Sequence, residues 1–325
     1  MKHLSAVLLA TVLLATGCGG DSDSSDVART GSSTGPGEGS TSAPAPGTST
    51  PSTPSTVPTA EPTSEPSQAS DPAARRTLRQ AQLALLGADT GSVRTLAVLG
   101  PNSIDTHAAY QITTSSMSAH ITLSGDEDAP LTTDAIAIGR DVWFRLRQGG
   151  DDPKQTCWMS ADNQALEEAT GADLPGGGRG TPAGLLVAAN ARAVSQLDGS
   201  RMLATIDLYT GASAFTGKLP ITLGIDFHTK DTVPVTIYLS DGEITGWRLT
   251  FFDLLHAVED AGVQLPAEFE GYEDQDLSHA HVTADFSDLG HAVVVEPPPA
   301  DLVVQLSGDA EQFAEDREAC DARVN

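Results

Sequence analysis

The sequence is poor in aromatic and in basic residues. Aromatic residues make up 5% of its 325 positions, and 18 Lys and Arg stand against 44 Asp and Glu, which gives a formal net charge of -26. A surface this acidic repels nucleic-acid phosphates, because binding to them depends on Lys and Arg displacing counterions. No basic cluster is present that could hold the polypeptide on an anionic membrane. Nucleic-acid binding is therefore excluded, and Val, Ile, Leu and Ala must build most of the core.

Recognised catalytic motifs are also missing. The sequence contains no G-x-S-x-G elbow between a predicted strand and helix, no H-E-x-x-H and no S-x-x-K; its one G-x-S-x-G string, residues 31–35, lies in a segment of Ser, Thr, Pro and Gly. His279 and His281 would share one face of a strand, where two imidazoles could bind an ion, but no third ligand accompanies them. We therefore predict a protein that is not an enzyme and that has no cofactor and no metal. An envelope hydrolase is the alternative, and it would need a polar cleft with a nucleophile and a base in contact.

Cysteine is scarce, with Cys18, Cys157 and Cys320 as the three positions. If Cys18 is acylated in an exported protein, Cys157 and Cys320 remain as an even pair in an oxidising compartment. We expect a disulfide between Cys157 and Cys320 that ties the C-terminal segment to the middle of the domain. Two unpaired thiols are the alternative.

The N-terminal apolar run is too short to form a permanent membrane span. Lys2 and His3 precede an apolar run over residues 4–15, and Thr16-Gly17-Cys18 closes it. This is the pattern of a secretory signal, here residues 1–17. Leu14-Ala15-Thr16-Gly17-Cys18 resembles the lipobox of bacterial lipoproteins, which implies an acylated Cys18 on the extracytoplasmic face of the cell membrane. An ordinary secretory signal with an incidental cysteine is the alternative.

Residues 18–70 lack both aromatic side chains and an apolar pattern. Val27 and Val57 are the only large aliphatic residues from position 19 to 70, within a background of Ser, Thr, Pro and Gly. Such a segment cannot bury enough apolar area to offset its chain entropy. We predict a disordered tether that holds a folded domain away from the membrane.

Residues 71–305 carry the patterns of an α+β domain. Asp71-Pro72 is typical of a helix start, and residues 181–197 and 253–262 also show helical spacing. Alternation of apolar and polar residues predicts consecutive antiparallel strands, the clearest being a hairpin of 233–239 and 244–252 around Asp241-Gly242. Further strands are predicted at 95–99, 108–114, 118–124, 142–146 and 281–286, with an edge strand at 293–295. Residues 163–170 and the acidic tail at 306–325 are predicted to be helical.

The order of these elements resembles the LppX/LprAFG lipoproteins of the actinobacterial cell envelope, relatives in fold of the LolA/LolB carriers. The lipobox carries the resemblance together with the 233–239 hairpin, its return through Trp247-Arg248-Leu249, and Phe286-Ser287-Asp288-Leu289-Gly290 leading to Pro297-Pro298-Pro299. The resemblance implies a half-barrel, a curved antiparallel sheet with helices on its concave face and a hydrophobic cavity between them. It also implies a non-enzymatic protein that binds or carries a lipid or lipoglycan, with an envelope transporter as a further partner.

Carried over by matching element, the cavity would be lined by apolar residues of three segments. On the strand at 142–146, the apolar side chains share one face, while Trp143, Arg145 and Arg147 share the other. The candidate lining residues are Val142, Phe144, Leu146, Leu185, Leu186, Val235, Ile237, Leu249 and Phe251. A filled core in an envelope protein-interaction or sensing lipoprotein is the alternative.

Overall fold

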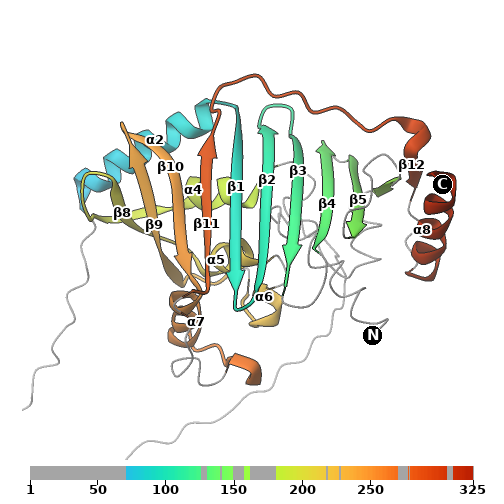
Figure 1. Cartoon of the computed structure of the whole chain (residues 1–325). Helices are drawn as coiled ribbons and strands as arrows, with labels where there is room; N and C mark the ends of the chain where they lie inside the picture. Colours follow the sequence, from blue (N-terminus) through green and yellow to red (C-terminus); the bar gives the residue numbers. More distant parts are fainter. Residues whose placement is uncertain are drawn as a thin grey trace, which may run out of the picture. The chain divides into compact units, whose positions relative to one another are not determined.

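A computed structural model describes residues 71–125, 130–139, 141–148, 157–161, 181–216, 219–226, 228–269, 277, 279–305 and 310–324. Within these ranges the chain forms one open sheet of twelve strands, in the order β12-β6-β5-β4-β3-β2-β1-β11-β10-β9-β8-β7 (Figure 1). Neighbouring strands are antiparallel except for β12 and β6, which are parallel. The prediction of an α+β fold with a large antiparallel sheet is confirmed. The strands are β1 (Thr90–Leu99), β2 (Asn102–Gln111), β3 (Ser116–Ser124), β4 (Leu131–Ile138), β5 (Asp141–Gln148), β6 (Trp158–Ala161), β7 (Arg192–Gln196), β8 (Arg201–Asp207), β9 (Thr232–Ser240), β10 (Glu243–Thr250), β11 (His281–Ser287) and β12 (Val303–Gln305).

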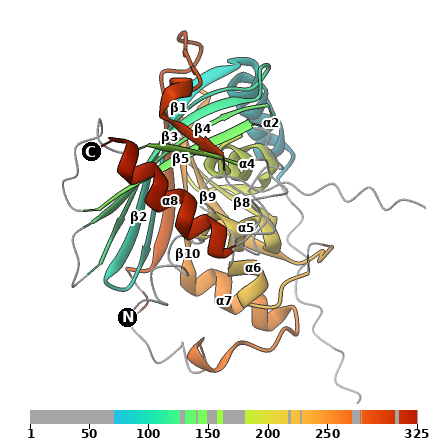
Figure 2. The ribbon, with the colours of Figure 1, turned by 90° about the vertical axis from the view of Figure 1, so that its right-hand side faces the viewer.

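Helices cover one face of this sheet. In Figure 1, α2, α4 and α5 lie behind the strands, on the side that carries the buried side chains. The helix α2 packs on β7 and β10, α4 on β1 and β10, α5 on β8, β9 and β11, and α7 on β9 and β10. The helix α8 packs beside β12 at one edge of the sheet (Figure 1) and faces the viewer in Figure 2, so the predicted helical tail is confirmed. The helices are α2 (Pro72–Gly87), α4 (Ala183–Asn190), α5 (Leu208–Phe215), α6 (Leu219–Thr222), α7 (Phe251–Asp260) and α8 (Ala310–Val324).

The predicted hairpin is confirmed as β9 and β10. Val233, Val235, Ile237 and Leu239 are all buried, because every second side chain of a strand points to the same face. Asp241 and Gly242 both adopt positive φ angles, of 54° and 85°, as a two-residue turn of the I′ type requires. The start of α2 is also as predicted, since the Asp71 side chain accepts a hydrogen bond from the Ala73 amide.

Two predicted element boundaries are wrong. Phe251 begins α7 instead of continuing β10, because Thr250 caps that helix by accepting a hydrogen bond from the Asp253 amide. The helix predicted over residues 181–197 ends at Asn190, and β7 follows it. The Gln82 side chain of α2 donates to the carbonyl oxygens of Ala188 and Ala191 at 2.9 and 2.8 Å, which satisfies groups that the end of α4 leaves open.

Further predictions differ from the structure or lie outside it. Residues 293–295 form no strand; the edge beside β6 is instead β12, after the run Pro297 to Pro299. The strands predicted at 95–99 and 108–114 begin earlier, at Thr90 and Asn102, and the second ends at Gln111. The helix predicted at 163–170 lies outside the described residues.

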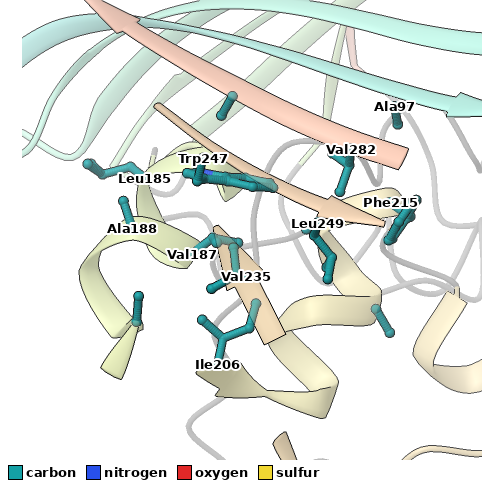
Figure 3. Packing of buried hydrophobic residues seen from close by; sticks show 14 of the residues in the cluster. Ala97, Leu185, Val187, Ala188, Ile206, Phe215, Val235, Trp247, Leu249 and Val282 are labelled. Carbon is teal, nitrogen blue, oxygen red and sulfur yellow. The ribbon is translucent and has the colours of Figure 1, made fainter. Parts of the chain in front are cut away.

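A close contact between Gly184 of α4 and the sheet joins the two layers. The indole Nε1 of Trp247, which is fully buried, donates to the carbonyl oxygen of Gly184 at 2.7 Å. A Cβ atom at Gly184 would lie 2.9 Å from Thr95 Oγ1 and 3.0 Å from a methyl group of Val93. Figure 3 shows Trp247 beside Leu185 in this layer of buried side chains. Only glycine lets α4 approach the sheet this closely.

We therefore expect Gly184→Ala to lower the free energy of unfolding by about 1–3 kcal/mol, because the added methyl group overpacks the layer. Gly87→Ala is the matched control, since a Cβ atom added there would meet no atom within 4 Å, and it should change stability by less than about 0.5 kcal/mol. Urea unfolding followed by Trp fluorescence measures both. Equal stability of the two variants would contradict the close packing of α4.

Candidate binding site

Small side chains form a row across the buried face of β2, β3 and β4. Ala108, Ala119 and Ala135 lie opposite one another in the strand register, between Val93 of β1 and Phe144 of β5. We call these three residues the alanine row. One neighbouring row holds Thr106, Ile121 and Thr133, and the other holds Tyr110, Met117 and Ala137. All of these side chains are buried, so the row is a shallow strip of methyl groups bordered by larger residues.

Two hydroxyl groups beside the alanine row are buried without a hydrogen-bond partner. They are the phenol of Tyr110, whose residue is 1% exposed, and Oγ1 of Thr133, which is 0% exposed. Burial also raises the pKa of Tyr110 to about 12. Buried polar atoms are nearly always paired in folded proteins, and an unpaired one costs about 1–3 kcal/mol. These two groups therefore indicate a place where a polar atom from outside the chain could bind.

The predicted cavity residues fall into two groups. Val142, Phe144 and Leu146 are buried on β5, beside the alanine row. The others lie under the helices, where Leu185 is buried and Leu186 is half-buried. Val235, Ile237, Leu249 and Phe251 are buried there as well. Phe251 packs edge-to-face against Phe215 and Phe269, with ring centroids 5.2 and 5.7 Å away.

The opposite face of the sheet holds a pocket of about 550 Å³ that the sequence did not predict. None of the nine predicted cavity residues lines it. Its charged and aromatic lining comes from Arg94, His107, His120, Asp134, Arg145 and Trp158. We call it the outer-face pocket. The alternation of side chains in the sequence predicts that Arg145 and Trp143 share one face of their strand. It does not predict which residues of the other strands lie beside Arg145, because that depends on the strand register.

Two aspartates organise the charges of this face. Asp105 accepts hydrogen bonds from Nε and Nη2 of Arg94 at 3.0 and 2.7 Å, and His107 Nε2 lies 3.3 Å from it. The hydrogen bond from Arg94 is the largest influence on the Asp105 carboxyl and, together with the nearby charges, lowers its pKa below the ordinary value despite partial burial.

Asp134 is the centre of a larger cluster. It contacts His120 Nδ1 at 2.7 Å and accepts hydrogen bonds from Arg145 Nε at 2.8 Å and Arg147 Nη2 at 3.0 Å. Burial raises the pKa of Asp134, but the hydrogen bonds from His120 and Arg145 and the charges of Arg145 and Arg147 outweigh it, so the pKa lies below the ordinary value. Arg145 also stacks over the Trp158 ring, 4.5 Å from its centroid.

The structure brings Cys157 and Cys320 into contact but has both as free thiols, without the predicted disulfide. Cys157 lies just before β6 and Cys320 lies on α8, and both are buried. The Cys157 thiol donates to the carbonyl oxygen of Cys320 at 2.8 Å. The disulfide stays a prediction, now with the two residues in contact.

The described residues contain no cluster of three or more His, Cys, Asp or Glu side chains that could hold a metal ion. His279 and His281 are in contact, but not as two imidazoles around one ion. Nδ1 of His281 lies 2.6 Å from the backbone oxygen of His279. None of the helices in the described ranges combines the length and apolar character needed to cross a membrane. Cys18 and the tether lie outside the described residues.

Comparison with models of known protein families gave no match to this chain, and comparison with curated proteins gave none. The resemblance to the LppX/LprAFG lipoproteins therefore rests on the sequence motifs.

The contribution of Asp134 to the stability of the fold should depend on pH. Because the folded pKa is lowered, Asp134 stabilises the fold above its ordinary pKa of about 3.9, and this contribution is lost as the pH falls through the folded value. Asp134→Asn should lower the free energy of unfolding by about 1–3 kcal/mol at neutral pH, because the neutral amide loses the negative charge and keeps one acceptor oxygen for three nitrogen groups. Thermal unfolding should show that the difference from wild type shrinks below about pH 4. Asp141→Asn, at an exposed position of β5, should change little; a difference independent of pH would contradict the assignment.

The cysteine pair makes a second prediction. Protein exported to an oxidising compartment should contain a Cys157–Cys320 disulfide, which stabilises the fold by about 2–4 kcal/mol. Peptide mass mapping without reduction should find the two peptides joined, and Cys320→Ser should lower the melting temperature to that of the reduced protein. Cys18→Ser is the control and should leave the bridge intact. Alkylation of both thiols in unreduced, unfolded protein would contradict the pairing.

Proposed function

We propose that this chain is a lipid-anchored, extracytoplasmic protein of the LppX/LprAFG type that binds an acylated lipid or lipoglycan without acting on it chemically. The sheet would be the curved wall of a half-barrel, with the helices on its concave face. The acyl chains would lie between the two layers. The alternative stays a filled-core lipoprotein that binds another envelope protein.

The alanine row is the observation that carries the proposal. Its three methyl groups make a low strip across three strands, and the flanking Ile121, Met117 and Phe144 are larger. The helices α2, α4, α5 and α7 pack on β1 and β7–β11, which is the other part of the sheet. An acyl chain lying over Ala108, Ala119 and Ala135 would gain about 0.8 kcal/mol for each buried methylene.

The two unpaired hydroxyl groups support a ligand that carries oxygen as well as hydrocarbon. Tyr110 and Thr133 border the alanine row on opposite sides, and each hydroxyl can donate a hydrogen bond. The carbonyl oxygen of an ester or amide is an acceptor that every acylated lipid supplies. Such a bond would remove the cost of an unpaired buried hydroxyl group.

The anchor in this proposal is Cys18. One acyl chain gives only marginal membrane binding, whereas the several chains expected on a lipobox cysteine hold a protein stably. The net charge of -26 gives the domain no electrostatic attraction to anionic lipid. The acyl chains would therefore supply the attachment, and residues 18–70 would set how far the domain reaches.

Mass spectrometry of organic extracts from the protein, purified from its own membrane, tests the proposal. Wild type should carry about one acylated lipid per chain besides the acyl groups on Cys18. Ala119→Phe should lose most of that lipid, because the aromatic ring occupies the alanine row. Ser103→Phe, on the opposite face of β2 and outside the outer-face pocket, is the matched control and should keep it. A folded wild-type protein without lipid would contradict the proposal and favour the filled-core alternative.

A further inference from the structure

The outer-face pocket arranges charged and imidazole groups in a single row across the sheet. In the strand register, Asp285 of β11 lies opposite Arg94 of β1, and Arg94 lies opposite His107 of β2. The row continues through His120 of β3 to Asp134 of β4 and Arg145 of β5. Five strands, β1 to β5, therefore contribute one pocket-lining side chain each to this line, and the two imidazoles are neighbours at its centre.

A carboxylate contacts one ring nitrogen of each imidazole. His107 meets Asp105 through Nε2, and His120 meets Asp134 through Nδ1. In the part of the chain that the structure describes, Nδ1 of His107 and Nε2 of His120 have no such partner. The side chains of both histidines are about half exposed, at 55% and 47%. Both rings are therefore oriented and still accessible to a ligand.

The adjacent row of the same face begins with small side chains and continues to Ile136 of β4. Ser92, Ala109 and Ser118 lie opposite one another in the register, and all three line the pocket. Ser287 and Asp288 close the β11 side. The volume of about 550 Å³ falls within the range of roughly 300–1,000 Å³ that is usual for small-molecule sites. Hydroxyl groups and carboxylates in the lining can pair with the hydroxyl groups of a ligand.

We propose that the outer-face pocket binds a small anionic solute of sugar size, with a carboxylate or phosphate group carried on a hydroxylated body. The anionic group would bind between Arg94, His107 and His120, through charge-assisted hydrogen bonds. The hydroxyl groups would reach Ser92, Ser118 and Asp134. The charged side chains project from the face opposite the alanine row, although Ala108, Ala119 and Ala135 also border the pocket. The proposal does not rest on the proposed lipid function.

The charge of the lining makes this binding depend on pH. Arg94 and Arg145 balance Asp134 and Asp288, so the lining is neutral when both imidazoles are neutral and gains two positive charges when both are protonated. His107 faces Arg94 on β1, Asp105 on its own strand and His120 on β3. His120 faces His107 and Asp134, with Arg145 and Arg147 beyond that carboxylate. Asp285 lies beyond Arg94. An anion should therefore bind more tightly in acid.

Isothermal titration calorimetry of the full mature chain in detergent tests this. The probes are glucuronate, glucose 6-phosphate, inorganic phosphate and neutral glucose, each at about pH 5.5 and about pH 7.5, on either side of the range in which imidazole usually titrates. We expect the two anionic sugars to bind at least roughly tenfold more tightly than glucose. Glucuronate keeps its charge at both pH values and should therefore bind more tightly at the lower pH. Glucuronate and glucose 6-phosphate distinguish a carboxylate from a phosphate ligand. Inorganic phosphate should bind more weakly than the sugar anions, because it has no hydroxylated body to reach Ser92 and Ser118.

Variants locate the site. His107→Gln with His120→Gln should reduce affinity at the lower pH at least roughly tenfold and remove the pH dependence, and Arg94→Gln should reduce it at both pH values. Arg201→Gln is the matched control, since Arg201 is an exposed arginine of β8 that is paired with Asp198 outside the pocket. Circular dichroism confirms that each variant is folded. No binding of either sugar anion at about pH 5.5, equal binding of glucose, or full binding by the folded histidine variant would each overturn the proposal.

Discussion

The alternation of side chains along twelve paired strands is the constraint on which the rest of this structure depends. An open sheet must cover its apolar face, and here α2, α4, α5 and α7 lie over part of that face while the opposite face carries ion pairs. The helix layer and the sheet are in close contact at Gly184, where the Trp247 indole donates a hydrogen bond to the backbone of α4. A shift of one residue in the register of β4 or β5 would turn Asp134, or Arg145 and Arg147, into the core.

The alanine row and the charged side chains of the outer-face pocket lie on opposite faces of the same strand segments. On β2, Ala108 belongs to the alanine row, while its neighbours His107 and Ala109 line the outer-face pocket. On β3, Ala119 stands between Ser118 and His120 in the same way. Small residues on both faces make this stretch of the sheet thin. A ligand on either side would therefore lie close to the backbone of β2 to β4.

Sequence reasoning predicted the features that depend on local pattern. The hairpin around Asp241-Gly242, the helix start at Asp71 and the buried faces of β5 and β9 follow from short-range spacing and turn chemistry. It failed where distant residues decide the outcome. The end of α4 depends on Gln82, more than one hundred positions away. The outer-face pocket depends on the register of several strands, which alternation in a single strand does not contain.

The central claim is that the apolar face of the sheet receives an acyl chain. Photo-crosslinking with a fatty acid that carries a diazirine on its chain tests it most directly, because the label attaches to whatever residue the chain touches. We expect labelled peptides that contain Ala119, Ala135 or Phe144. Excess unlabelled palmitate should prevent this labelling. Labelling confined to outer-face residues, or labelling that palmitate does not reduce, would contradict the central claim.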